Sequence, residues 1–259
     1  MERTIHFVPT REHFDGYEHF NNGFFPIGFA EGRRDLLCHR EFFEPVLSKG
    51  FGFLGREVSY VYKAKVLPGQ EVDIYTKVDE HFRGEKIILS QSMMTGEKVM
   101  ATAKMICNLN GESYRIGDKF ADVMQGKHES RIVLNIKNEH VSDGIVKDGA
   151  FPQYLEEGRL QLALQTGLNV RALVEKNIGF LVMGAIYRYT GRIRGDQELR
   201  VVSQYAPYRK EVRVEIKQQV TSGEKVVVEA HLYYFFYNFS TSRPIRPPED
   251  IMRKARLID

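Results

Sequence analysis

The residues best suited to chemistry gather in one short polar stretch, HFDGYEHFNN at positions 13–22. This stretch contains Asp15, His19 and Asn22 and runs directly into the apolar segment GFFPIGFA. A carboxylate such as Asp15 can attack a reactive carbonyl carbon, or it can activate a water molecule as a general base. A histidine can orient that water or exchange a proton near neutral pH. These residue types therefore suit hydrolysis of an activated acyl group.

The segment that follows, residues 23–38, predicts a helix that is buried over much of its surface, because aromatic and small side chains dominate it. Pro26 is tolerated only in a first helical turn, which places the helix start near Asn22 and Gly23. The first amides of a helix lack internal partners and carry the positive end of its dipole, so they can stabilise a developing oxyanion. Gly23 would let a substrate carbonyl approach the backbone closely.

Structural explanations exist for the same residues. Asp15 and Gly16 form a common turn pair, and Asn22 is an ordinary helix N-cap, which contributes about 1 kcal/mol to helix stability. Glu31 lies in the middle of the predicted helix, where it is either catalytic or paired with Arg33 or another basic residue.

The composition excludes several classes of protein. With 259 residues and 42% hydrophobic side chains, the chain can bury a substantial core. The net charge is only +3, with basic and acidic residues interspersed, so no nucleic-acid partner is indicated. Cys38 and Cys107 lack the spacing of a metal site or a disulfide framework. No apolar run reaches the length needed for membrane insertion, and we expect a soluble, cytoplasmic protein without metal or cofactor.

The chain also contains an internal repeat. Six residues of the helix region recur at a constant offset of 126: Gly23, Phe25, Pro26, Glu31, Gly32 and Arg33 match Gly149, Phe151, Pro152, Glu157, Gly158 and Arg159. Further along, residues 96–98 match residues 223–225 at an offset of 127. The sequence therefore predicts two copies of one module, at residues 1–110 and 131–259, with a linker at 111–130 and a helix in the C-terminal tail.

The sequence pattern of each copy predicts the same order of elements, namely a short strand, one long helix and several long strands separated by turns. This order indicates an α+β fold in which an antiparallel sheet wraps around a central helix. The polar stretch itself is not repeated, since adding 126 carries Asp15 to Val141 and His19 to Ile145. We therefore expect chemistry only in the first copy. The recurrence of Glu31 and Arg33 as Glu157 and Arg159 favours a structural role for Glu31.

Residues 15–31, DGYEHFNNGFFPIGFAE, resemble the motif DxNxHVNNxxYxxWxxE of the acyl-carrier-protein thioesterases, which carry two hotdog modules in one chain. Asp15, His19, Asn21, Asn22 and Glu31 occupy matching positions, whereas Tyr17, Phe25 and Gly28 replace the family's Asn, Tyr and Trp. The related acyl-CoA branch has DxxGHVNN at the same place, and here Glu18 replaces its Gly. The resemblance implies a tandem (double) hotdog fold.

The resemblance also implies a function, the hydrolysis of acyl thioesters of acyl carrier protein or coenzyme A in lipid metabolism. Asp15, His19, Asn22 and Glu31 would be catalytic, and Gly23, Phe24, Phe25 and Phe29 would bind the acyl group. The nearest candidate for the family's further carboxylate is Glu57, which does not align with it. Surface Arg and Lys would meet the phosphopantetheine arm or an acidic carrier.

Two alternatives remain open at this stage. One is a hotdog hydratase or dehydratase, and the other is a noncatalytic module that binds or senses an acyl ligand. The sequence also leaves open the acyl chain length, the choice of carrier and whether the protein forms a homo-oligomer.

Overall fold

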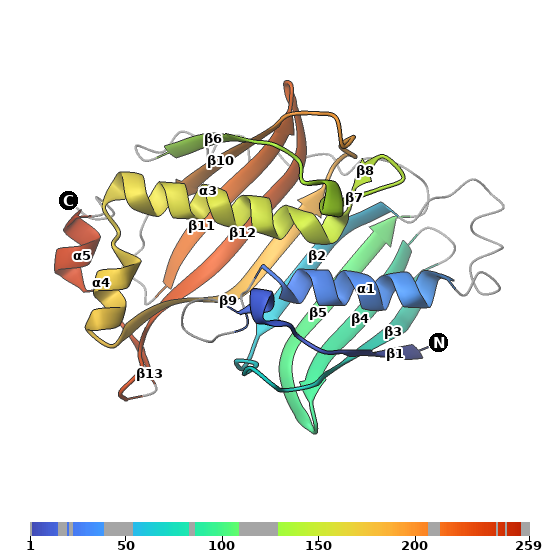
Figure 1. Ribbon diagram of the computed structural model, residues 1–259, viewed down its shortest axis with the longest axis horizontal. Coiled ribbons are helices and arrows are strands. Elements are labelled where there is room, and N and C mark those ends of the chain that lie inside the picture. Colours follow the sequence, from blue (N-terminus) through green and yellow to red (C-terminus); the bar gives the residue numbers. More distant parts are fainter. Residues whose placement is uncertain are drawn as a thin grey trace. The chain divides into compact units, whose positions relative to one another are not determined.

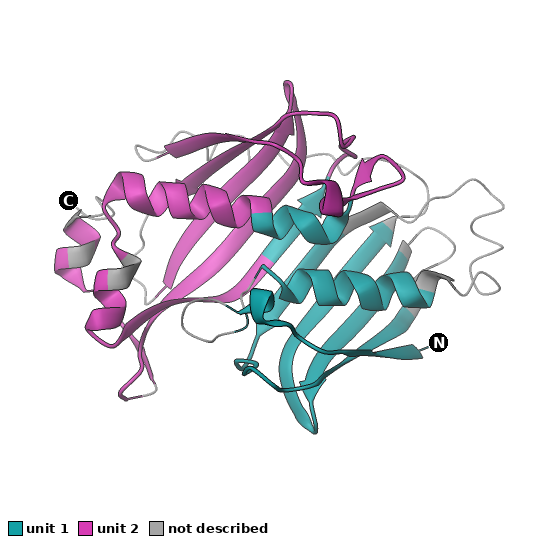
Figure 2. Cartoon of the chain, viewed as in Figure 1, with its two compact units in different colours: residues 1–114, 147–153, 186–189 teal, residues 115–146, 154–185, 190–259 magenta. Residues whose placement is uncertain are grey.

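The computed structural model describes residues 2–14, 20, 23–38, 54–82, 86–108, 129–206, 213–241, 243–246 and 248–254. The predicted linker at 111–130 lies outside this part of the chain except for its last two residues. The chain forms two compact units, which Figure 2 shows in different colours. Unit 1 comprises Met1–Tyr114, Lys147–Gln153 and Ile186–Tyr189, and unit 2 comprises Arg115–Val146, Tyr154–Ala185 and Thr190–Asp259.

Unit 1 consists of one long helix, α1 (Phe25–Cys38), on an antiparallel sheet (Figure 1). The strands follow the order β1 (Glu2–Phe7), β3 (Val72–Phe82), β4 (Lys86–Thr95), β5 (Lys98–Asn108) and β2 (Leu54–Tyr62). A 3-10 helix, η1 (Arg11–His13), precedes the polar stretch. Helix α1 begins with Phe25 and Pro26, in agreement with the predicted first turn.

Unit 2 repeats this arrangement with α3 (Phe151–Thr166), whose first residues belong to unit 1. Its strands are β6 (Glu129–Leu134), β10 (Leu199–Tyr205), β11 (Arg213–Ser222), β12 (Lys225–Asn238) and β9 (Ile178–Tyr189), which ends in unit 1. The smaller elements are η4 (Asn138–His140), β7 (Val141–Ser142), β8 (Ile145–Val146), η5 (Asp148–Ala150), α4 (Val170–Glu175), β13 (Arg243–Ile245) and α5 (Glu249–Lys254). Both units are α+β.

Equivalent strands pair in the same register in the two units. Ile74 pairs with Met93 in unit 1, and Val201 pairs with Val220 in unit 2, so both partners are displaced by 127 residues. Strand β1 pairs with β3 as β6 pairs with β10, again at an offset of 127. The repeat therefore includes the strands that precede the helices.

A buried hydrogen-bond network fixes α1 on its sheet. The Arg33 guanidinium donates to Gln91 Oε1 at 2.7 Å, and Gln91 Nε2 donates to the Phe29 carbonyl and to Thr76 Oγ1, both at 2.8 Å. A Cβ atom on Gly32 would lie only 2.8 Å from Thr76 Oγ1, so the glycine permits this close approach.

Unit 2 contains the same network at the equivalent positions. Arg159 donates to Gln218 Oε1 at 2.8 Å, and Gln218 Nε2 donates to the Leu155 carbonyl at 2.7 Å and to Ser203 Oγ at 2.6 Å. Gly158 takes the place of Gly32. The repeated Gly-Arg pair is therefore structural in both copies, because it seats a helix over a buried glutamine.

Candidate active site

The predicted catalytic residues Asp15, His19 and Asn22 lie outside the described residues. The structure describes the residues on either side of positions 15–19. Phe14 and Phe20 pair across an isolated antiparallel bridge, and their ring centroids are 5.7 Å apart. Phe20 is buried, and its amide donates to the Val66 carbonyl at 3.3 Å. Phe14 and Phe20 are thus attached to the core of unit 1.

The start of α1 brings three of the four predicted acyl-binding residues together. Gly23 and Phe24 form the turn before the helix, and the Phe24 carbonyl accepts from the amides of Ile27 at 3.1 Å and Gly28 at 3.2 Å. Phe25 follows, fully buried, with its ring 5.2 Å from that of Tyr62.

Phe29 lies one turn further along the same helix face. It is fully buried, and its ring is 5.8 Å from that of Tyr60. The four predicted acyl-binding residues thus lie within the first two turns of α1 and the turn before it, with Phe25 and Phe29 against β2.

A histidine that the sequence analysis did not single out lies at the same helix end. The His13 ring is 4.7 Å from that of Phe24 and 6.0 Å from that of Phe20. Its Nδ1 accepts from the Thr10 amide at 2.8 Å, which leaves Nε2 to carry the proton. The repeat was the signal that would have found it, because η4 ends in His140 as η1 ends in His13.

Glu31, the fourth predicted catalytic residue, lies away from this cluster. Its side chain is 38% exposed and forms an ion pair with Arg34 on the next turn of α1. Arg33, the partner considered from the sequence, is buried and bound to Gln91 instead. Glu57 is also occupied, because Arg188 Nε donates to it at 2.8 Å.

Arg33 is the centre of a buried polar cluster in unit 1. Burial lowers the pKa of Arg33, but Tyr60, Tyr189 and Asp148 raise it by more, so the guanidinium remains charged. Burial raises the pKa of Tyr60 and holds that of Tyr189 well above its usual value. Element η5 brings Asp148 to α1, since a Cβ on Gly149 would lie 3.2 Å from the Cα of Ile27.

The second copy has a tight hairpin where the first has its polar stretch. Val141 pairs with Val146 as Phe14 pairs with Phe20, but four residues separate the valines and five separate the phenylalanines. The offset is therefore 127 before the hairpin and 126 after it. This corrects the equivalence of Asp15 with Val141, because Val141 corresponds to Phe14 and Ser142 is the residue that follows it.

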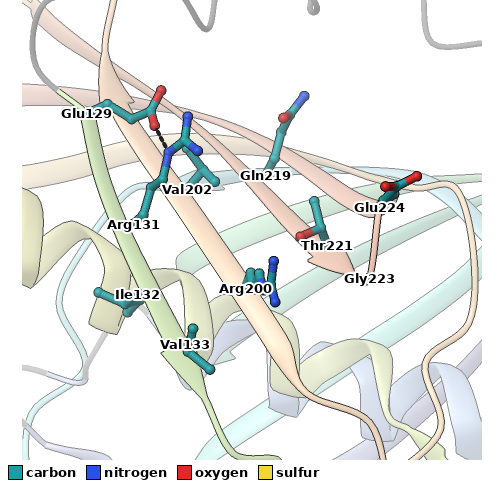
Figure 3. A pocket seen from close by; sticks show the side chains of 10 residues that line it. All are labelled: Glu129, Arg131, Ile132, Val133, Arg200, Val202, Gln219, Thr221, Gly223 and Glu224. Carbon is teal, nitrogen blue, oxygen red and sulfur yellow. Dashed lines mark hydrogen bonds and ion pairs between the residues drawn. The ribbon is translucent and has the colours of Figure 1, made fainter.

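A surface pocket of about 480 Å³ lies elsewhere, in unit 2 (Figure 3). The pocket is lined by Arg200 and Val202, whereas Val201 and Ser203 contact Gly158 of α3. Successive residues of a strand face opposite sides of a sheet, so the pocket opens on the face opposite α3. Its two arginines are already paired, Arg131 with Glu129 and Arg200 with Glu198. None of the predicted site residues lines it, and we place no chemistry there.

Within the described part of the chain, no three His, Cys, Asp or Glu side chains gather to hold a metal ion. None of the described helices is long and apolar enough to cross a membrane.

Comparison by sequence finds no matching protein family and no matching curated protein. Comparison of structures finds clear relatives of the fold. The 12:0-ACP thioesterase from Umbellularia californica aligns with a TM-score of 0.66 and 8% identity, over 94% of this chain and 94% of that one. An acyl-ACP thioesterase from Bacteroides thetaiotaomicron aligns with a TM-score of 0.58 and 13% identity, over 90% of this chain and 97% of that one.

A third structure is a hot dog fold protein of unknown function from Alicyclobacillus acidocaldarius. It aligns with a TM-score of 0.58 and 10% identity, over 90% of this chain and 93% of that one. These likenesses extend over nearly the whole chain. The chain therefore has the predicted α+β architecture, a tandem hotdog in which each copy is an antiparallel sheet with a central helix.

Proposed function

We propose that this protein is a thioesterase that hydrolyses acyl thioesters of acyl carrier protein or coenzyme A to a free acid and a free thiol. The observation that carries the proposal is the attachment of the polar stretch to the start of α1. Asp15 directly follows Phe14, His19 directly precedes Phe20, and these two phenylalanines are paired. The candidate nucleophile or base is thus tethered, within one residue, to a defined position in the core.

The start of α1 would provide the positive electrostatic potential that stabilises the oxyanion of the reaction. Amides of the first turn have no partners within the helix, and Pro26 has no amide proton to offer. In the proposal, the thioester carbonyl approaches the backbone at Gly23, and nearby amides stabilise the oxyanion as it forms. Asn22 would hold these amides in place as an N-cap.

Asp15 would either attack the carbonyl carbon to give an anhydride, which water then hydrolyses to the free acid and the Asp15 carboxylate, or remove a proton from water that attacks the carbonyl directly. In both cases the carbon–sulfur bond breaks and the thiol leaves with a proton. His19 would orient the water or supply that proton, and Phe24, Phe25 and Phe29 would contact the acyl group. We assign no chemistry to Glu31, since Arg34 occupies it at the helix surface.

The proposal includes a cytoplasmic location and a role in fatty acid or lipid metabolism. Two solved structures with this fold are acyl-ACP thioesterases, which supports the choice of substrate class.

The test is thiol release from a panel of acyl-CoA and acyl-ACP thioesters of graded chain length, with purified protein. The proposal expects continuous turnover with at least one carrier. A protein that binds these thioesters stoichiometrically without releasing thiol would instead be an acyl-binding module, and the proposal would be wrong.

A further inference from the structure

His13 lies beside the start of α1, where three phenylalanine rings hold its imidazole. Its ring centroid is 5.2 Å from that of Phe7 on β1 and 4.7 Å from that of Phe24, and both contacts are edge-on. The Phe20 ring stacks against it at 6.0 Å. Contacts from three separate segments of unit 1 thus fix the plane of the imidazole, which is what a group needs if it must act at a defined place.

The hydrogen bonds of η1 fix the tautomer of the same imidazole. The Thr10 amide donates to Nδ1 at 2.8 Å, and a proton on Nδ1 would face this N–H group. The bonded form is therefore the neutral imidazole with its proton on Nε2. None of the described residues accepts a hydrogen bond from Nε2, and the side chain is only half-buried. The N–H group at Nε2 is therefore available to a ligand.

This tautomer decides what His13 can do in the proposed reaction. A neutral imidazole with its proton on Nε2 can donate a hydrogen bond there, but it cannot remove a proton through that nitrogen. Phe24 directly follows Gly23, the residue at which the proposed reaction places the thioester carbonyl. The imidazole beside Phe24 thus lies at the end of the helix where the carbonyl oxygen would gain negative charge. Donors held in place before the reaction stabilise such an oxyanion most effectively.

The second copy shows which part of this arrangement the fold itself requires. His140 ends η4 as His13 ends η1, so a histidine closes this turn in both copies. His140, however, is 8% exposed and bonds through Nδ1 to the Tyr154 hydroxyl at 2.8 Å. The three phenylalanines have no aromatic counterpart there, because the equivalent positions hold Leu134, Val146 and Ala150. The aromatic setting and the partial exposure thus belong to the copy that carries the polar stretch.

We propose that His13 is a further catalytic residue, a neutral donor whose Nε2–H group bonds to the thioester carbonyl oxygen as the oxyanion forms. The role belongs to the proposed thioesterase function, on which this inference rests. His13 keeps its proton throughout. The hydrogen bond strengthens as the carbonyl carbon becomes tetrahedral, and the electron pair returns from the oxygen when the carbon–sulfur bond breaks. The proton of the departing thiol comes from His19 or water.

The experiment measures kcat and KM for acyl-CoA hydrolysis by two substitutions of this histidine. His13→Phe keeps an aromatic ring among the phenylalanines but removes the donor. Its kcat should fall by about 10²- to 10³-fold, the usual effect of one lost oxyanion donor, while KM changes little. His13→Gln gives up the ring contacts but offers an amide N–H group, so its kcat should exceed that of His13→Phe by about tenfold.

A purely structural histidine predicts the opposite order, because phenylalanine preserves the ring contacts and glutamine does not. A kcat of His13→Phe that equals or exceeds that of His13→Gln would therefore overturn the inference. His140→Phe is the matched control, which should lower the melting temperature but keep wild-type kcat per folded molecule. Melting temperatures establish that each variant is folded at the assay temperature. A loss of kcat in folded His140→Phe as large as that in His13→Phe would also overturn the inference.

Ligand binding separates this inference from the proposed function. If the wild type hydrolyses the thioesters and His13→Phe does so equally well, only the role of His13 fails. If the wild type hydrolyses none of them, the thioesterase proposal fails, and an acyl-CoA is then compared with the alkyl-CoA thioether of equal chain length, which lacks only the carbonyl oxygen. Greater thermal stabilisation by the thioester, lost in His13→Phe, would uphold His13 as the donor to that oxygen. Equal stabilisation by the two ligands, or none, would refute it.

Discussion

Phe14 and Phe20 pair across an antiparallel bridge, and the five residues between them in the sequence include Asp15 and His19. Phe20 is 3% exposed and contacts the Phe25 ring at 4.7 Å, so the bridge is tied to the first turn of α1. Chemistry at this site needs groups held close to the productive geometry, and residues adjacent to a bridge that includes the buried Phe20 meet that need better than a free loop. The bridge therefore links the sequence motif to the helix that would complete it.

The close contact of the two helices with their sheets predicts an unusual effect of alanine. Glycine to alanine in a helix interior normally stabilises a protein by about 0.5–1 kcal/mol. At Gly32 the added methyl group would meet Thr76 Oγ1 at 2.8 Å, and at Gly158 it would meet Ser203 Oγ at 2.6 Å. We expect Gly32→Ala and Gly158→Ala each to lower the free energy of unfolding by about 1–3 kcal/mol, measured in urea. Gln165→Ala, at an exposed position of α3, is the control, and stabilisation by either glycine substitution would refute the contact.

The ion pairs of Glu57 and Glu31 predict that neither carboxylate is needed for turnover. Both residues pair with arginines at partly exposed positions, where such pairs contribute about 1 kcal/mol or less. Glu57→Gln and Glu31→Gln should each leave kcat within about twofold of the wild type, because a lost general acid or base lowers rates by about 10²- to 10⁴-fold. A loss in that larger range for either variant would place it in the catalytic machinery.

The surroundings of His231 predict a loss of stability on acidification. Burial lowers the pKa of His231, and Lys217 and Arg213 lower it further, although Glu215 raises it through a hydrogen bond of 2.8 Å. The unfolded chain therefore binds this proton at higher pH than the folded protein does, so the free energy of unfolding falls as pH drops below about 6.5. The free energy of unfolding of His231→Gln, measured by urea titration, should fall less steeply between about pH 7 and pH 5 than that of the wild type. Parallel slopes for variant and wild type would mean that His231 does not contribute.

We expect substitution of the equivalent residues His13 and His140 to lower the stability of the protein by different amounts. His140 is 8% exposed, and its Nδ1 bonds to the Tyr154 hydroxyl at 2.8 Å, whereas Gly28 occupies the position equivalent to Tyr154 in the first copy. His140→Phe should therefore cost about 1–3 kcal/mol of stability, because it leaves a buried hydroxyl with one partner fewer. His13→Phe, which preserves the aromatic contacts, should cost less than that. Equal losses in thermal or urea unfolding would contradict the asymmetry.

The sequence was sufficient for those features that depend on local pattern. The recurrence of Gly32 and Arg33 as Gly158 and Arg159 revealed the repeat, and Pro26 located the first turn of α1. Composition around these residues predicted a helix with a buried face, and turn residues separated the strands. Each of these signals lies within a few residues of the element it defines.

The rest depends on contacts between residues that are far apart in the chain. Arg33 bonds to Gln91, 58 positions away, and no local signal marks Gln91 as its partner. The second copy is one residue shorter in its hairpin, and only the pairing of Val141 with Val146 located this difference. Tyr60 resembles any other aromatic strand residue in the sequence, and only the fold reveals its burial beside Arg33.

The central claim is that Asp15 performs the chemistry in the first copy alone, and Asp15→Asn tests it most directly against Asp143→Asn. Asp143 lies in the hairpin turn of the second copy with φ at 51°, a conformation that asparagine adopts readily, so this control should fold normally. Thiol release from the best acyl thioester is measured for both variants, with melting temperatures confirming that each is folded. We predict that Asp15→Asn loses about 10²- to 10⁴-fold in kcat while Asp143→Asn keeps wild-type turnover. Wild-type turnover in folded Asp15→Asn, or a loss confined to Asp143→Asn, would contradict the account.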